Sequence, residues 1–177
     1  AKQTDMNVLG PNCLGFNNKK SNLNATFGAD IKNSGNLRII SQSGAIATAL
    51  VDFGESINLG IDQLITLGNK AVVSENDILS YWKDDKNYPT GVYLESVSNG
   101  KKLVEILKNY TKNNPVFILK PGKSAGAVVA MMSHTGAIAG EDSILEQAIR
   151  ESGAVRCDEL SDFFDLCMAF KSEKIPK

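Results

Sequence analysis

The chain has 177 residues, of which 42% are hydrophobic and 22% charged, and its formal net charge is -1. This composition is typical of a soluble globular protein, and the length is sufficient for one well-filled core. The near-neutral charge argues against nucleic acid and anionic membranes as partners, because both attract basic surfaces. No apolar run reaches the roughly 18–20 residues of a membrane span, so we predict no membrane association.

The three cysteines, Cys13, Cys157 and Cys167, do not form a pairable framework and lack the spacing of a zinc site. We therefore predict free thiols, a reducing cytoplasmic location and no bound metal. No apolar run follows Lys2, so we expect no signal peptide at the start of this sequence. Because the first residue is not methionine, we expect a fragment of a longer protein.

Residues 1 to about 34 contain several clusters of turn-forming residues. Gly10-Pro11-Asn12 comes first, the polar stretch 17–24 follows, and Asn33-Ser34-Gly35 ends the region. Such clusters are typical of loops. The sequence therefore predicts an irregular segment over residues 1–34, either a linker or the end of a preceding domain.

From about residue 36, short apolar runs alternate with segments of helical periodicity. The runs that predict strands are 37–40, 64–67, 91–94, 115–119 and 154–156. The segments that predict helices are 43–53, 77–83, 101–110, 142–151 and 160–170. This alternation predicts an α/β domain over residues 35–172 with a flavodoxin-like, doubly wound, parallel five-stranded sheet, followed by a tail at 173–177.

In such sheets, ligands bind beyond the carboxyl ends of the strands. The loops to consider are therefore 41–44, 68–70, 95–98 and 121–141. The last is rich in Gly, Ala and Ser, and it contains His134, the only histidine of the chain. Loops longer than about 12–15 residues in compact domains are usually functional or disordered. We predict a functional role for His134.

The loop Ser41-Gln42-Ser43-Gly44 lies between a predicted strand and a predicted helix. Free N–H groups at a helix start attract anions, and glycine lets an anion approach the backbone. The loop thus fits a phosphate cradle, although a plain serine helix cap explains the same residues equally well.

Glu95 ends the third apolar run. A carboxylate at this edge can accept a hydrogen bond from an imidazole N–H and leave the other ring nitrogen free as a nucleophile. The alternative is an ordinary surface glutamate at the end of a strand.

Three other motifs are weaker. A P-loop ending at Gly122-Lys123-Ser124 would need glycine where Phe117 stands. A serine-hydrolase elbow centred on Ser43 lacks both of its glycines, which argues against a hydrolase using Ser43 and His134. Cys13 as a reactive thiol is a further, weaker alternative, because most single cysteines are not reactive.

Taken together, the motifs resemble one family, the ADP-forming acyl-CoA (acetyl-CoA) synthetases, which are relatives of the succinyl-CoA synthetase alpha subunit. The resemblance covers almost the whole chain, and its most specific block is Ser133-His134-Thr135-Gly136-x-x-Ala139-Gly140. The other matching segments are Gly10-Pro11-Asn12-Cys13-x-Gly15, Ser41-Gln42-Ser43-Gly44, Gly68-Asn69-Lys70 and Glu95. One departure is Val72, where the family often has an acidic residue.

The resemblance implies a role for each segment. Residues 1–34 would end a CoA-binding domain that is absent from this chain. His134 would carry the phosphoryl group, and Glu95 would orient it. The helix start formed by Ser41, Gln42, Ser43 and Gly44 would bind the phosphoryl group. The CoA and acyl groups would lie near Asn12, Cys13, Gly68 and Asn69.

The implied reaction is acyl-CoA + ADP + phosphate ⇌ carboxylic acid + CoA + ATP. It needs coenzyme A, a nucleotide and Mg²⁺, with the nucleotide and Mg²⁺ bound mainly by an ATP-grasp domain or subunit outside this chain. One helix terminus contributes only about 0.3–1 kcal/mol to binding a phosphoryl dianion, so a second positive group must help. The alternative function is a regulatory CoA- or acyl-CoA-binding module of a larger protein such as a protein acetyltransferase.

Overall fold

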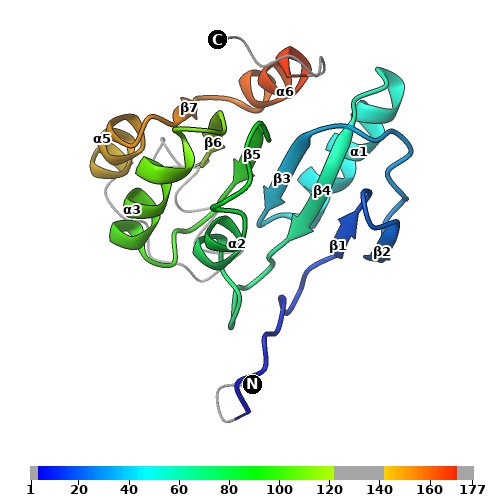
Figure 1. The fold of residues 1–177 in the computed structure, drawn as a ribbon, viewed down its shortest axis with the longest axis horizontal. Helices are drawn as coiled ribbons and strands as arrows, with labels where there is room; N and C mark the ends of the chain where they lie inside the picture. The colour runs from blue at the N-terminus through cyan, green and yellow to red at the C-terminus, as the bar shows by residue number, and fades with distance from the viewer. Residues whose placement is uncertain (1–3, 122–141, 171–177) are drawn as a thin grey trace.

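A computed structural model describes residues 4–121 and 142–170 of the chain (Figure 1). One sheet of seven strands runs through the molecule, in the order β2-β1-β4-β3-β5-β6-β7. Its strands are β1 (Gly15–Asn18), β2 (Leu23–Thr26), β3 (Leu37–Ser41), β4 (Ile61–Thr66), β5 (Thr90–Tyr93), β6 (Val116–Leu119) and β7 (Val155–Cys157). No helix within the described residues is both long and apolar enough to cross a membrane.

The five expected strands β3 to β7 are all present, and they pair in parallel with one another. Strands β3 and β6 are buried along their whole length, and their residues are apolar except for Arg38 and Ser41 of β3. The prediction of a doubly wound α/β fold is therefore confirmed. The count of five describes only the parallel part of the sheet.

The prediction of an irregular segment over residues 1–34 is wrong for the β1–β2 hairpin. The two strands pair antiparallel with each other, and β1 also pairs antiparallel with β4. The hairpin therefore extends the sheet beyond β4, with β2 as the edge strand. Thr66 fixes the hairpin, because its Oγ1 accepts from the Gly15 N–H at 2.9 Å and donates to the Gly15 carbonyl at 2.8 Å. The side chains of β2 are mostly exposed, so no apolar pattern in the sequence predicts this strand. That residues 1–34 also end a CoA-binding domain stays a prediction.

The helices cover both faces of the sheet, as the sequence predicts. They are α1 (Gly44–Ser56), α2 (Glu75–Tyr81), α3 (Gly100–Tyr110), α5 (Asp142–Glu151) and α6 (Leu160–Ala169). One buried core joins the sheet to α1 and α6, and a second joins it to α2, α3 and α5 (Figure 1). This three-layer arrangement brings the loops that follow β3, β4 and β5 to one edge of the sheet.

Candidate functional site

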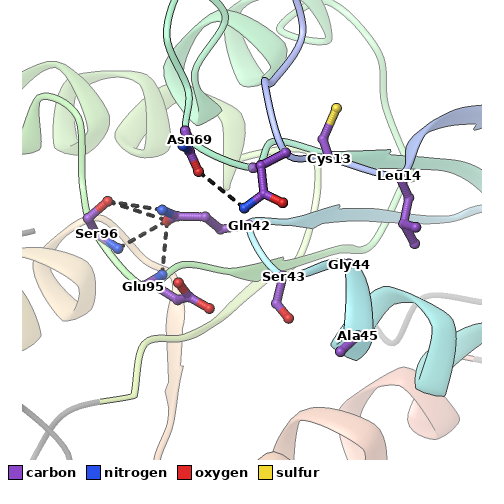
Figure 2. Close-up of a pocket in the computed structure, with 11 residues that line it drawn as sticks. Cys13, Leu14, Gln42, Ser43, Gly44, Ala45, Asn69, Glu95 and Ser96 are labelled. Carbon is purple, nitrogen blue, oxygen red and sulfur yellow. Dashed lines mark hydrogen bonds between the residues drawn. The ribbon is translucent and has the colours of Figure 1, made fainter. Parts of the chain in front are cut away.

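A cavity of about 530 Å³ lies at the carboxyl ends of β3, β4 and β5 (Figure 2). Its walls come from the N-terminal segment and from the loops that follow these three strands. The lining residues are Asn12, Cys13, Leu14, Gln42, Ser43, Gly44, Ala45, Gly68, Asn69, Glu95 and Ser96. Most of the residues that the sequence singles out therefore line one cavity.

The floor of the cavity includes the start of α1. Ser43 caps this helix, and its Oγ accepts from the Ile46 N–H at 3.3 Å. Among the described residues, no hydrogen bond engages the N–H groups of Gly44 and Ala45, the first two residues of the helix. A side chain at Gly44 would meet Leu14 Cγ at 3.0 Å, so glycine lets the N-terminal segment pack closely here. The helix start can thus be capped by Ser43 and still offer two amides to an anion.

Ser41 and Gln42, predicted to bind phosphate, use their side chains for contacts inside the protein. Ser41 is 1% exposed, and its Oγ donates to the Ser43 carbonyl at 2.7 Å. The Gln42 Oε1 accepts from the N–H groups of Glu95 and Ser96, each at 3.0 Å (Figure 2). The Ser41 side chain therefore stabilises its own loop, and the Gln42 side chain joins this loop to the one after β5. The phosphate contacts of both residues stay a prediction.

Glu95 follows β5 and is half-buried in the cavity wall. Burial raises the pKa of the neighbouring Tyr93, and the negative charge of Glu95 raises this pKa further. The carboxylate thus brings negative charge to the sheet edge, where it can accept a hydrogen bond from an imidazole. His134 and the block Ser133–Gly140 lie outside the described residues, so the predicted contact between His134 and Glu95 stays a prediction.

The segments 10–13 and 68–70 lie against each other at the cavity edge. The Asn69 N–H donates to the Pro11 carbonyl at 2.9 Å, and Asn12 Nδ2 donates to Asn69 Oδ1 at 3.4 Å. Gly68 has a φ of +55°, and a side chain there would collide with the carbonyl oxygens of Pro11 and Asn12. Cys13 is a half-buried free thiol in the same wall. The structure therefore brings together Asn12, Cys13, Gly68 and Asn69, as the sequence predicts.

A buried ion pair that the sequence does not reveal lies behind the cavity. Lys70 Nζ lies 3.0 Å from Glu75 Oε2, and the two side chains are 5% and 0% exposed. Lys70 belongs to the recognised Gly68-Asn69-Lys70 motif, but nothing in the spacing identifies Glu75 as its partner. Leu14, Ala45 and Ser96 are the lining residues that the sequence analysis does not name. Within residues 4–121 and 142–170, no cluster of acidic, histidine or cysteine side chains could hold a metal ion.

Comparison with known proteins identifies both the domain and its relatives. The family model for the succinyl-CoA ligase like flavodoxin domain matches residues 34–170. A 4-hydroxybutyrate–CoA ligase [ADP-forming] of Nitrosopumilus maritimus is 40% identical over 99% of the chain, which spans 26% of that protein. The alpha subunit of an acetate–CoA ligase [ADP-forming] I of Pyrococcus furiosus is 34% identical over the whole chain, which spans 38% of that subunit.

A solved structure agrees with these relatives. The acetyl-coenzyme A synthetase 1 of Ca. Korarchaeum cryptofilum, in complex with phosphate and ADP, superposes with a TM-score of 0.90 and 34% sequence identity. The match covers 97% of this chain and 38% of that chain. The chain therefore has the length of one part of these larger proteins. On the match over residues 34–170, it belongs to the family of succinyl-CoA ligase like flavodoxin domains.

Proposed function

We propose that this chain is the phosphohistidine-bearing domain of an ADP-forming acyl-CoA synthetase, an acid–thiol ligase that interconverts acyl-CoA, ADP and phosphate with carboxylic acid, CoA and ATP. The observation that supports this most is the shared cavity, where the start of α1, Glu95 and the two segments containing Asn12 and Gly68 meet. Relatives named as ADP-forming ligases for 4-hydroxybutyrate and acetate support the same reaction class.

In the proposed reaction, phosphate lies at the amides of Gly44 and Ala45. One of its oxygens attacks the thioester carbonyl, the carbon–sulfur bond breaks, and the CoA thiolate leaves and takes a proton. The Asn12–Cys13 and Gly68–Asn69 segments border the acyl and CoA groups during this step. The product that stays bound is the acyl phosphate.

His134 then attacks the phosphorus of the acyl phosphate, and the carboxylate leaves as the phosphorus–oxygen bond breaks. Glu95 accepts a hydrogen bond from the other imidazole nitrogen, which orients the ring and stabilises its developing positive charge. An oxygen of the ADP β-phosphate finally attacks the phosphohistidine, and cleavage of the phosphorus–nitrogen bond gives ATP and free His134.

The charge of the phosphoryl group requires help from outside the described residues. The α1 terminus supplies about 0.3–1 kcal/mol, or up to about 2 kcal/mol when partly buried. Lys70 cannot supply the remainder, because its ammonium already pairs with Glu75. We therefore assign the second positive group to an ATP-grasp domain or subunit that also binds the nucleotide. Mg²⁺ would accompany that nucleotide, since the described residues bring no suitable ligand cluster together.

The remaining partners follow from the same proposal. A CoA-binding domain would precede this chain, and residues 1–34 would end it. The substrates would be a small carboxylic acid and its CoA thioester. The reducing cytoplasm is the proposed location, since the three free cysteines need no oxidising compartment.

The test is labelling of the complete enzyme with ATP that carries a radioactive γ-phosphate. We expect label on the protein that is acid-labile and alkali-stable, that is lost in His134→Ala, and that forms about 10- to 100-fold more slowly in Glu95→Gln. Thermal unfolding checks that both variants are folded. Label that persists in His134→Ala contradicts the assignment. A folded wild type that binds CoA but takes up no label supports the regulatory module instead.

A further inference from the structure

Gln42 binds backbone N–H groups of the turn that contains Glu95. One oxygen, Gln42 Oε1, accepts from the backbone N–H groups of Glu95 and Ser96 at 3.0 Å each, and Gln42 Nε2 lies 3.1 Å from Ser96 Oγ (Figure 2). Gln42 directly follows β3, whereas Glu95 and Ser96 follow Leu94 after the end of β5, the neighbour of β3 in the sheet. The side-chain amide of Gln42 therefore connects the loop 41–44 to the backbone of the turn at Glu95 and Ser96.

Lys70 binds a backbone carbonyl of the same turn. Lys70 Nζ donates to the Ser96 carbonyl at 2.6 Å and to Glu75 Oε2 at 3.0 Å. Glu75, at the start of α2, also accepts from the Ser98 N–H at 2.7 Å. Lys70 itself has a φ of +52°, a conformation that costs free energy in a non-glycine residue. One buried ion pair thus fixes two backbone groups of the segment that follows Glu95.

We propose that Gln42 and Lys70 are positioning residues that fix the orientation of Glu95, an inference that rests on the proposed phosphoryl transfer. Ser96 has its N–H bound by Gln42 and its carbonyl bound by Lys70, so the adjacent Glu95 cannot rotate about its backbone without breaking one of these contacts. A buried ion pair adds little net stability, so its geometric role is the better explanation for its presence.

The same contacts argue against the obvious alternative, in which both side chains bind the phosphoryl group directly. Gln42 Oε1 already serves two backbone donors. Lys70 is 5% exposed on its side chain and is absent from the cavity lining. Both groups therefore act on the substrate through Glu95.

Two substitutions remove the contacts separately. Gln42→Met keeps the length of the side chain but cannot accept the two N–H groups. The pair Lys70→Met/Glu75→Gln removes the donor to Ser96 without leaving an unpaired buried carboxylate, and the amide oxygen of the introduced glutamine can still accept from the Ser98 N–H. In the complete enzyme, we expect each change to slow uptake of label from γ-labelled ATP about 10- to 100-fold, because small displacements of a catalytic group have effects of this size.

The deciding measurement repeats both changes in a Glu95→Gln background, with labelling followed over hours to resolve the slow rates. Residues that act through Glu95 should lower the rate by less than about twofold once Glu95 is replaced, because coupled residues are not additive. Direct phosphate ligands should instead retain their full effect in this background. Full effects there, or unchanged rates in the wild-type background, overturn the inference.

Matched controls separate positioning from general destabilisation. Gln63→Met removes the acceptor of Trp82 Nε1 at 3.2 Å, and Lys102→Met removes an ion pair with Asp77 at 3.6 Å. Neither contact touches the Glu95 turn, so both controls should label at the wild-type rate even where unfolding midpoints fall. The two test variants are independent, so either folded one decides the question. An unlabelled wild type would refute the proposed function, whereas a labelled wild type with unaffected variants refutes only the positioning role.

Discussion

Gly68 lies in a backbone region that residues with a side chain rarely adopt, and it lies against the N-terminal segment at the cavity edge. In Gly68→Ala the new methyl would collide with the carbonyl oxygens of Pro11 and Asn12, so the two segments must separate. We expect a loss of about 1–3 kcal/mol in the free energy of unfolding, measured by urea denaturation. If the proposed function holds, the complete enzyme carrying Gly68→Ala should also bind CoA more weakly, as measured by calorimetry.

Gly100 provides the matched control for this change. It is the first residue of α3, and a methyl group there would meet nothing within 4 Å. Gly100→Ala should leave stability unchanged or raise it by about 0.4–1 kcal/mol, because alanine restricts the unfolded chain. Equal losses in both variants would show that the contact at Gly68 does not matter.

At the scale of single residues, sequence reasoning identifies the right loops but not every side-chain direction. Glu95 and Gly44 could be predicted because each lies shortly after the end of a strand at the ligand-binding edge. Gln42 lies in the same loop as Gly44, yet its amide turns to the backbone of Glu95, which is 53 positions away. Such a contact depends on the pairing of β3 with β5, so no local pattern reveals it. The Lys70–Glu75 ion pair spans only five positions, but it joins a loop to the start of α2, so neither strand nor helix periodicity indicates it.

At the scale of elements, the β1–β2 hairpin depends on one threonine. Thr66 is 1% exposed, and its hydroxyl holds both backbone groups of Gly15. Thr66→Val keeps the shape but leaves these groups unpaired, at a cost of about 1–3 kcal/mol. We expect faster hydrogen exchange of the amides in residues 15–26, measured by mass spectrometry, with less change in β5 and β6.

The control for this prediction is Thr48→Val. The Thr48 hydroxyl donates to the Gly44 carbonyl within α1, and among the described residues it makes no hydrogen bond to the hairpin. Its loss should leave exchange in residues 15–26 as in the wild type. If Thr66→Val exchanges no faster than Thr48→Val, the hairpin does not depend on the Gly15 contacts.

The parallel strands and the hairpin differ in how visible they are in the sequence. Strands β3 and β6 bury every residue, and apart from Arg38 and Ser41 these residues are apolar, so the sequence predicts both strands directly. The hairpin strands have only four residues each, and Asn17 is buried through a hydrogen bond to Asp30 at 2.8 Å. Backbone pairing and polar contacts stabilise this element, and hydrophobic periodicity does not report either of them.

At the scale of the whole molecule, two buried thiols make the fold sensitive to alkali. Burial, followed by the negative charge of Asp162, raises the pKa of Cys157 to about 12, and burial also raises the pKa of Cys167. Unfolded cysteine titrates near 8.5. Each thiol has a higher pKa in the folded state than in the unfolded state. Its contribution to the free energy of unfolding is therefore complete below about pH 8.5 and is lost as the pH rises. The loss approaches about 1.4 kcal/mol per pH unit per thiol.

Urea denaturation between pH 7 and pH 9.5 measures this loss. Cys167→Ala should be less stable than the wild type at pH 7, because it leaves a small gap, but should lose less stability as the pH rises. Met168→Ala is the control, because Met168 is next to Cys167 in the sequence, its side chain does not titrate and the residue is 40% exposed. Its pH dependence should follow the wild type. Equal slopes for all three proteins would contradict the prediction.

The overall architecture could be predicted because alternating strands and helices leave few topologies open. The arrangement of the N-terminal segment could not, since it depends on pairing with β4 rather than on any signal of its own. As a result, a shortened protein that starts at residue 34, where the family match begins, would lack the whole hairpin. Strand β4 would then become an open edge with unpaired N–H and carbonyl groups. Such edges recruit other chains, so trimming the protein to the family boundary should produce aggregation in place of a smaller folded unit.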